Sequence, residues 1–285
     1  MMKRLCLGIL FFYSVLFGSD MGKEHLFVIS GVVVNSNSSQ KIENFIQMIE
    51  NKSGYKLKPF YVSSYTRLSE VLRQNPDALG WTCGAPYVED SLKDGQQLIA
   101  LPLFNGTPTY SSFIVTRRSE KANRLSDFKN RVFAYSDLRS NSGYVAPATI
   151  LKRDGFDIKN FFRVSISAGS HEKSIEAINR GLADVGAIDE YVWVEYTRKR
   201  PHLKEKLHVI ERVGPFPFTP IVAGKDVNKK TVSILQKTLV GMDKKELMTF
   251  KKEFSLDGFV VKDKAFFEPI KKNMLLIGVD LPEKR

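Results

Sequence analysis

The chain contains the stretch Ser136-Asp137-Leu138-Arg139-Ser140-Asn141-Ser142-Gly143-Tyr144-Val145-Ala146-Pro147, in which hydroxyl, amide and glycine residues precede a helical pattern. The first backbone N–H groups of a helix lack intrahelical partners and lie at the positive end of its dipole. Ser140, Asn141 and Ser142 add side-chain donors, and Gly143 allows a ligand to approach the backbone closely. The stretch predicts an anion-binding loop, with an ordinary Ser/Asn helix cap as the alternative.

Strand and helix patterns alternate on both sides of this loop. Apolar runs typical of buried strands are followed by amphipathic segments with helical spacing. The expected strands cover residues 25–32, 56–62, 78–81, 98–103, 112–116, 132–135, 161–166, 183–188 and 207–211. Extended crossings are expected near 113–117 and 219–223, and basic amphipathic helices over 228–241, 244–254 and 265–273. The alternation predicts an α/β fold with mainly parallel sheets in two lobes.

Composition indicates a globular protein with a preference for anionic partners. The 285 residues are 43% hydrophobic and 26% charged, and the formal net charge is +12. Such a positive field favours small oxyanions, acidic surfaces, nucleic acid or lipid headgroups. Residues 1–19 have a basic start, an apolar run and small residues at the end, which predicts a secretory signal peptide. Removing it leaves Cys83 as the one cysteine, so no internal disulfide can form.

The expected domain organisation follows the two sets of strands. Residues 20–116 and 220–285 form the first lobe in this interpretation, and residues 117–219 form the second. Ligands of open α/β sheets bind at the carboxyl ends of the strands. Both lobes direct such ends toward one cleft, with residues 63–65 and 82–87 from the first lobe and residues 136–142 and 189–191 from the second.

Four segments together resemble the phosphonate-binding (PhnD-type) periplasmic solute-binding proteins of ABC importers. They are Ser140-Asn141-Ser142-Gly143-Tyr144, Gly169-Ser170-His171-Glu172 with the helix that follows, residues 181–189, and Gly84-Ala85-Pro86-Tyr87-Val88. The resemblance implies a type II periplasmic-binding-protein fold, in which two α/β lobes joined by two crossing strands close on the ligand. It covers about residues 60–225, while the termini fit only in pattern.

The resemblance also implies the roles of individual residues. Ser140, Asn141 and Ser142 would hold the phosphonate oxygens, and His171 would donate to them from the neighbouring turn. Tyr65 and Tyr87 would close the cleft from the other lobe. Relatives more often have Ser-Thr-Ser at 140–142, but the Asn141 amide still donates. Val192 and Thr219 stand where acidic residues would meet a ligand amine, so an aminoalkyl phosphonate is not favoured.

Each of these residues also has a structural interpretation. His171 fits a helix cap or a surface histidine, and Tyr65 and Tyr87 fit core aromatics. Asp189 at a strand end fits either a hydrogen-bonding group in the cleft or a helix N-cap. Cys83 fits a small buried hydrophobe, although its place beside the expected cleft would also suit a soft ligand such as arsenite. Tyr110 is expected to be structural.

The function predicted is that of an extracytoplasmic solute-binding protein that captures a small phosphonate- or phosphite-like oxyanion between two lobes. Its partner would be the membrane permease of an ABC importer. The alternative is a periplasmic sensor partnering a membrane histidine kinase, with Cys83 involved in oxyanion or arsenite sensing. We expect a monomer without cofactor, metal or nucleic-acid partner. A periplasmic enzyme on the same fold is the weaker hypothesis, because no catalytic constellation has a motif around it.

Overall fold

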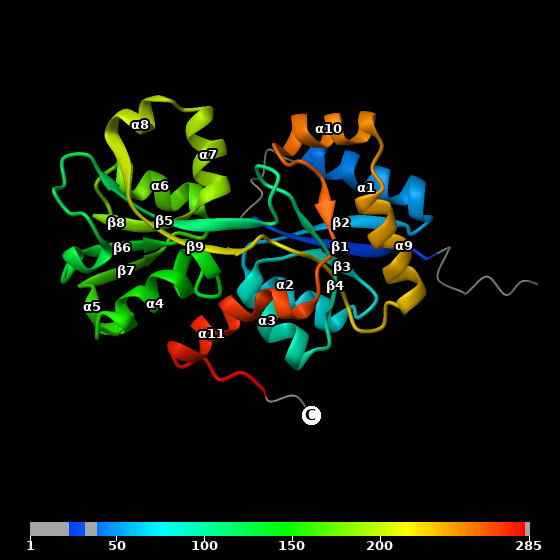
Figure 1. Cartoon of the computed structure of the whole chain (residues 1–285), viewed down its shortest axis with the longest axis horizontal. Coiled ribbons are helices and arrows are strands. Elements are labelled where there is room, and N and C mark those ends of the chain that lie inside the picture. The colour runs from blue at the N-terminus through cyan, green and yellow to red at the C-terminus, as the bar shows by residue number, and fades with distance from the viewer. Residues whose placement is uncertain (1–22, 32–38, 283–285) are drawn as a thin grey trace, which may run out of the picture.

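The computed structural model describes residues 23–31 and 39–282, which form two α/β halves side by side (Figure 1). The predicted signal peptide therefore lies outside the described residues. The first half contains a six-stranded sheet. Its strands in spatial order are β11 (Phe259–Val260), β4 (Gln97–Pro102), β10 (Ile221–Ala223), β3 (Leu79–Trp81), β1 (His25–Ser30) and β2 (Leu57–Val62). The β1 strand pairs parallel with β2 and β3, whereas β10 and β11 run antiparallel to their neighbours.

The second half contains a five-stranded sheet. Its strands in spatial order are β7 (Val164–Ser167), β6 (Val132–Tyr135), β8 (Val185–Asp189), β5 (Thr109–Arg117) and β9 (Leu207–Pro217). The β6 strand pairs parallel with β7 and β8, and β5 pairs antiparallel with β8 and β9. The long β5 and β9 strands reach toward the first half, and the chain passes between the halves at both of their inner ends (Figure 1).

Helices cover both sheets and place apolar residues against them. Those of the first half are α1 (Ser39–Ser53), α2 (Tyr65–Gln74), α3 (Gly84–Lys93), α9 (Lys229–Val240) and α10 (Lys244–Phe254). Those of the second are α4 (Ala146–Arg153), α5 (Ile158–Phe161), α6 (His171–Asn179), α7 (Glu190–Arg198) and α8 (His202–Lys206). The last helix, α11 (Glu268–Leu276), packs against both α3 and α4 and so touches both halves.

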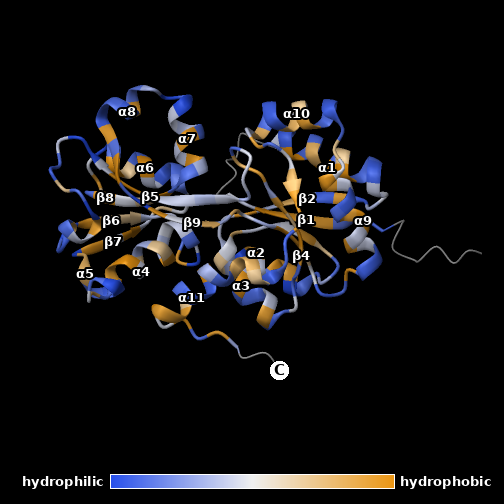
Figure 2. Ribbon diagram, viewed as in Figure 1, coloured by the Kyte–Doolittle hydropathy of each residue, from blue (hydrophilic) through white to orange (hydrophobic). Residues whose placement is uncertain are grey.

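The core follows the period-2 alternation of the strands. On β5, Phe113 belongs to the apolar cluster on one face of the second sheet and Ile114 to the cluster on the other face. Both faces are therefore buried, which is typical of α/β layers. Figure 2 shows apolar residues concentrated on the strands, with hydrophilic residues on the outer faces of the helices. These layers hold the ends of the strands, and the loops that follow them, in fixed positions between the two halves.

Several local predictions differ from the structure. Residues 84–87, expected at the end of a strand, begin helix α3 directly after Cys83. The strand expected over 161–166 is β7, which begins only at Val164, because the one-turn helix α5 extends through Phe161. The strand expected over 207–211 is β9, which continues to Pro217. Of the two expected crossings, residues 113–117 belong to β5 of the second sheet and residues 221–223 to β10 of the first. The division into lobes at 116/117 and 219/220 stays a prediction, and strand pairing assigns residues 109–116 to the second half.

Candidate functional site

The loop expected to bind an anion, called the anion loop here and defined as residues 136–143, connects β6 to α4. Ser136 and residues 140–143 are buried, whereas Leu138 is exposed. Ser140 is its helix cap, and the Ser140 hydroxyl oxygen accepts a hydrogen bond from the Gly143 N–H at 3.0 Å. The next turn, Asn141–Val145, is a π-helix, with the Val145 N–H donating to the Ser140 carbonyl at 3.1 Å. Single π-turns are frequent at functional sites because they alter which groups face inward.

Gly143 is required by the packing of this loop. A Cβ atom at Gly143 would collide with the Ser136 hydroxyl oxygen and would lie 3.0 Å from that of Ser140. The sequence predicted a glycine that allows a ligand to approach the backbone. In the structure the glycine instead allows two serine hydroxyls of the protein to approach it.

His171, at the start of α6, lies beside the loop and is buried. Its Nδ1 lies 3.2 Å from the Asp189 backbone nitrogen, whose N–H can donate to it, and this contact favours the tautomer with the ring proton on Nε2. Nε2 lies 3.2 Å from the Ser136 hydroxyl oxygen and 3.4 Å from that of Ser140. Burial lowers the pKa of His171 to about 3, against a weaker opposing effect of a backbone hydrogen bond at Ala187. The imidazole is therefore a neutral donor that orients the loop hydroxyls.

Asn141 and Ser142 are both at most 1% exposed, and each has a polar side-chain atom without a partner. The Asn141 amide nitrogen donates to the Tyr110 hydroxyl at 3.1 Å, while its Oδ1 has no hydrogen-bond partner among the described residues. The Ser142 hydroxyl is likewise unpartnered there, although the Ser142 carbonyl accepts from Ser112 at 2.7 Å. Unpaired buried polar atoms are costly and call for an explanation such as an ion or ligand.

Cys83 and Tyr65, both from the first half, contact the anion loop. The Cys83 Sγ accepts a hydrogen bond from the Asn141 N–H at 3.4 Å, so it meets the first N–H of the π-turn. Burial raises the pKa of Cys83, which keeps the thiol neutral. Tyr65 packs on Cys83, and the buried Tyr65 hydroxyl has no hydrogen-bond partner in the described part of the chain. Burial raises the pKa of Tyr65 well above its usual value.

Asp189 and Tyr87 make the structural contacts that were considered beside a cleft role, a helix N-cap and a core aromatic, and a ligand contact of either residue stays a prediction. The Asp189 carboxylate caps α7, accepting from Tyr191 N–H at 2.8 Å and Val192 N–H at 3.2 Å, and burial raises its pKa to about 7. Its backbone N–H supports His171, so Asp189 acts on the site through that contact. The Tyr87 ring packs edge-on against Phe267, with centroids 4.7 Å apart. Tyr87 thus serves the contact of α3 with the C-terminal segment.

Sequence reasoning missed one residue that the structure brings to the loop and the contacts of two residues within it. Tyr110, expected to be structural, places its hydroxyl against Asn141. Within the loop, Ser136 faces His171. Arg139 extends into the first half, a direction that no sequence pattern indicates. The described residues contain no group of three or more His, Cys, Asp or Glu side chains arranged for a metal ion. None of the helices in 23–31 and 39–282 is long and apolar enough to cross a membrane.

Comparisons with known proteins identify the family of this chain and several of its relatives. A family model described as "ABC transporter, phosphonate, periplasmic substrate-binding protein" matches residues 32–266. The phosphonates-binding periplasmic protein of Escherichia coli (strain K12) is 23% identical over 209 residues, or 70% of this chain and 61% of that protein. The probable ABC transporter phosphite-binding protein PhnD1 of Prochlorococcus marinus is 27% identical over 171 residues, or 58% of each. The chain thus spans about three fifths of the length of these curated relatives.

Solved structures confirm the fold. A binding protein component of an ABC phosphonate transporter from Pseudomonas aeruginosa superposes with a TM-score of 0.80 at 19% identity, covering 89% of this chain and 86% of that one. PhnD1 from Prochlorococcus marinus in complex with methylphosphonate gives the same TM-score and identity and covers 90% and 99%. The fold is that of the type II periplasmic binding proteins. Within it, the chain belongs to the phosphonate-binding periplasmic protein family of ABC transporters.

Proposed function

We propose that this protein captures a small phosphonate- or phosphite-like oxyanion at the anion loop and delivers it to the permease of an ABC importer. The observation that supports this most directly is the buried Ser142 hydroxyl, a donor without a hydrogen-bond partner among the described residues. Family membership supports the same ligand class. The related PhnD1 structure contains methylphosphonate, which makes that molecule the first ligand to test.

The loop offers neutral hydrogen-bond donors, which suit a tetrahedral anion. The Ser140 oxygen accepts from Gly143 N–H and lies within reach of His171 Nε2–H, which leaves its own proton for a third partner. The Ser142 hydroxyl adds a second donor. The π-turn leads into α4, so the positive end of a helix also faces the bound charge. Neutral donors in a buried site stabilise an anion without the cost of burying a cation opposite it.

Transport requires that the ligand enter and leave a site that is buried between two lobes. We propose that the lobes open and close by rotation about the two crossing connections near residues 103–108 and 218–220, which is hinge motion of the kind such two-lobed binding proteins use. Export to the periplasm would be directed by residues 1–19. The alternative of a sensor of an oxyanion or arsenite gains no support from Cys83, because its Sγ already accepts a hydrogen bond from Asn141 N–H and the described residues contain no second thiol to share a soft ligand.

Calorimetric titration of the protein with methylphosphonate, phosphite, phosphate, sulfate and arsenite tests the proposal. Binding should also raise the free energy of unfolding by about 2.7 kcal/mol at a hundredfold excess of ligand over Kd. Ser142→Ala should weaken binding of the phosphorus oxyanions about tenfold or more, because a hydrogen bond to a charged group contributes about 1.5–3 kcal/mol.

The matched control is Ser126→Ala. The Ser126 hydroxyl is also buried and unpartnered among the described residues, but it lies in the short 3-10 helix Leu125–Phe128. Ser126→Ala should leave the affinity for the oxyanions unchanged. Equal affinity in the wild type, Ser142→Ala and Ser126→Ala would rule out the loop as the site. Binding of arsenite alone would replace the transport hypothesis by the sensor.

A further inference from the structure

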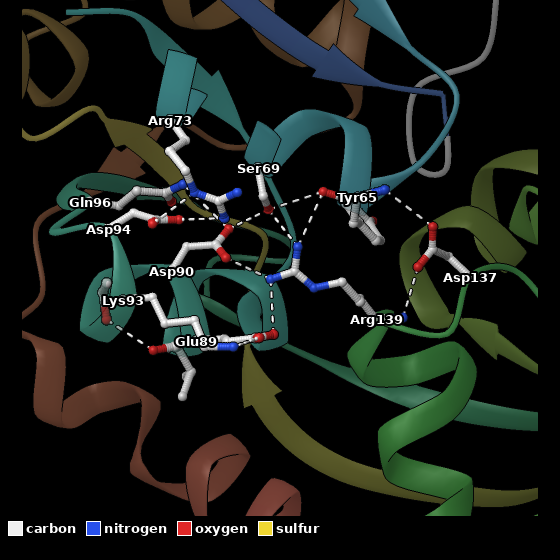
Figure 3. Close-up of polar contacts among 12 residues, drawn as sticks. Tyr65, Ser69, Arg73, Glu89, Asp90, Lys93, Asp94, Gln96, Asp137 and Arg139 are labelled. Carbon is white, nitrogen blue, oxygen red and sulfur yellow. Dashed lines mark hydrogen bonds and ion pairs between the residues drawn. The ribbon is translucent and has the colours of Figure 1, made fainter. Parts of the chain in front are cut away.

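A group of charged and polar contacts joins the two halves beside the anion loop (Figure 3). Arg139 comes from the loop, and its guanidinium reaches helices α2 and α3 of the other half. Its Nη2 donates to Asp90 at 2.6 Å and to Glu89 at 3.0 Å. Its Nη1 donates to the Ser69 hydroxyl at 2.5 Å and lies 3.4 Å from the Tyr65 carbonyl. We name Arg139, Ser69, Glu89 and Asp90 the interlobe clasp.

Asp137 adds a second contact in the same direction. Its Oδ2 accepts from the Tyr65 N–H at 3.1 Å, at the N-terminus of α2, and its Oδ1 accepts from the Arg139 N–H at 2.7 Å. A carboxylate at this end of a helix is favourable because of the helix dipole. Both side chains therefore attach the segment just before Ser140 to one pair of helices in the opposite half.

The side chains of the clasp are largely buried, so their ion pairs contribute to the stability of the contact between the halves. The Asp90 side chain is 2% exposed, and Arg139 and Glu89 are about one fifth exposed. Burial raises the pKa of Asp90, and the adjacent Arg139 opposes that shift. Ion pairs in fully exposed positions contribute little, whereas removing one partner of a buried pair is costly.

The clasp is also built to open. Asp90 keeps two partners within its own half, the Ser69 hydroxyl and the Gln96 side-chain amide at 3.3 Å. Glu89 keeps Lys93, whose Nζ lies 2.6 Å from Glu89 Oε1. When the halves separate, Glu89 keeps its ion pair with Lys93 and Asp90 keeps two neutral hydrogen-bond partners. Separation also gives Arg139 and the Asp90 side of the contact access to water, which compensates part of the lost ion pairing and keeps opening reversible.

We propose that the interlobe clasp, through Arg139, stabilises the closed arrangement of the lobes and thereby sets how fast a bound ligand is released. Arg139 lies within the anion loop, but its guanidinium contacts the opposite half. It therefore positions the two lobes relative to one another. The proposal rests on the proposed function only in requiring that the lobes open and close. It assigns to Arg139 a role separate from holding the ligand.

The test compares Arg139→Met with Arg73→Met. Arg73 forms a two-pronged ion pair with Asp94, at 2.9 Å for each contact, entirely within the first half. Small-angle X-ray scattering measures lobe separation without ligand, and stopped-flow measurements with methylphosphonate give the association and dissociation rates. Arg139→Met should increase the radius of gyration and raise the dissociation rate about tenfold to a hundredfold, in the range of typical coupling energies. The association rate should change little. Arg73→Met should have the radius of gyration and both rates of the wild type.

Arg139→Lys provides a second variant if Arg139→Met unfolds. Lysine keeps the charge but cannot span both carboxylates, so the dissociation rate should lie between those of the wild type and Arg139→Met. A radius of gyration and a dissociation rate in both Arg139 variants equal to those of Arg73→Met would overturn the clasp. If the wild type bound no oxyanion, the proposed function would fail while the scattering comparison still decided the clasp.

Discussion

The Nδ1 atom of His171 accepts a hydrogen bond from the backbone N–H of Asp189 at 3.2 Å. This contact favours the tautomer of the imidazole that directs its Nε2–H toward Ser136 and Ser140. The same ring also faces Ser136, so His171 connects the ends of two neighbouring strands of the second sheet. These are β8, which ends at Asp189, and β6, which Ser136 follows. The orientation of the anion loop therefore depends on a contact between residues far apart in the sequence.

His171 should remain neutral well below the pH at which histidine usually titrates. Burial lowers the pKa of His171 to about 3, so the Nε2–H tautomer should persist from pH 8 to about pH 4. Nitrogen-15 NMR of the imidazole distinguishes the two tautomers and the charged ring. A titration of this ring near pH 6.5, or a proton on Nδ1, would contradict the geometry described above.

Asp189→Asn should change how stability depends on pH. Burial raises the pKa of Asp189 to about 7, so between about pH 4 and 7 the folded state binds more protons at this carboxyl than the unfolded state. That contribution makes wild-type stability fall as pH rises through this window. His171 acts in the opposite sense, because its contribution is lost as pH falls from about 6.5 toward 3.

The asparagine amide oxygen can still cap α7, so the variant should fold. Its stability relative to the wild type should improve steadily from pH 4 to pH 7 and then level off, as measured by urea unfolding at several pH values. A pH-independent difference between the two proteins would show that the Asp189 carboxyl is not titrating in this range.

Gly143→Ala should destabilise the protein by about 1–3 kcal/mol, the usual cost of forcing an extra methyl group into a packed interior. The cause is the collision of the new Cβ with the Ser136 hydroxyl. Adding Ser136→Ala removes that oxygen, so the double variant should lose less stability than the sum of the single variants. A double-mutant cycle from chemical unfolding measures this coupling, and strict additivity would refute the collision.

Asp184→Asn should cost about 1–2 kcal/mol at neutral pH, because the carboxylate accepts from Arg131 at 2.9 Å and Arg117 at 3.1 Å. The hydrogen bond from Arg131, with help from Val132 N–H, lowers the pKa of Asp184 to about 2. A lowered carboxyl pKa contributes stability that is present above about pH 4 and is lost as pH falls toward 2. Acid unfolding of the wild type and the variant should therefore converge in that window.

The sequence by itself determined the α/β class, its division into two lobes and the donor-rich loop, and the resemblance to a known family implied the type II fold. Periodic apolar runs and the residues 140–143 carry that information locally, since strand period and helix capping depend on near neighbours. The family resemblance added the ligand class and a cleft role for Tyr87. Of the two interpretations that the sequence left open for Asp189, the structure shows the helix N-cap at α7, and it shows Tyr87 packed against Phe267.

Only the tertiary structure decided what surrounds the loop. Tyr110 and Cys83 contact the loop, and Arg139 extends from it, through contacts between residues 31 to 74 positions apart in the sequence. A side chain's partner across such a distance is set by how the two sheets stack and by which rotamers remain free after packing. That is why the helix tip could be predicted from the sequence, while the neutral imidazole behind it and the arginine clasp beside it could not.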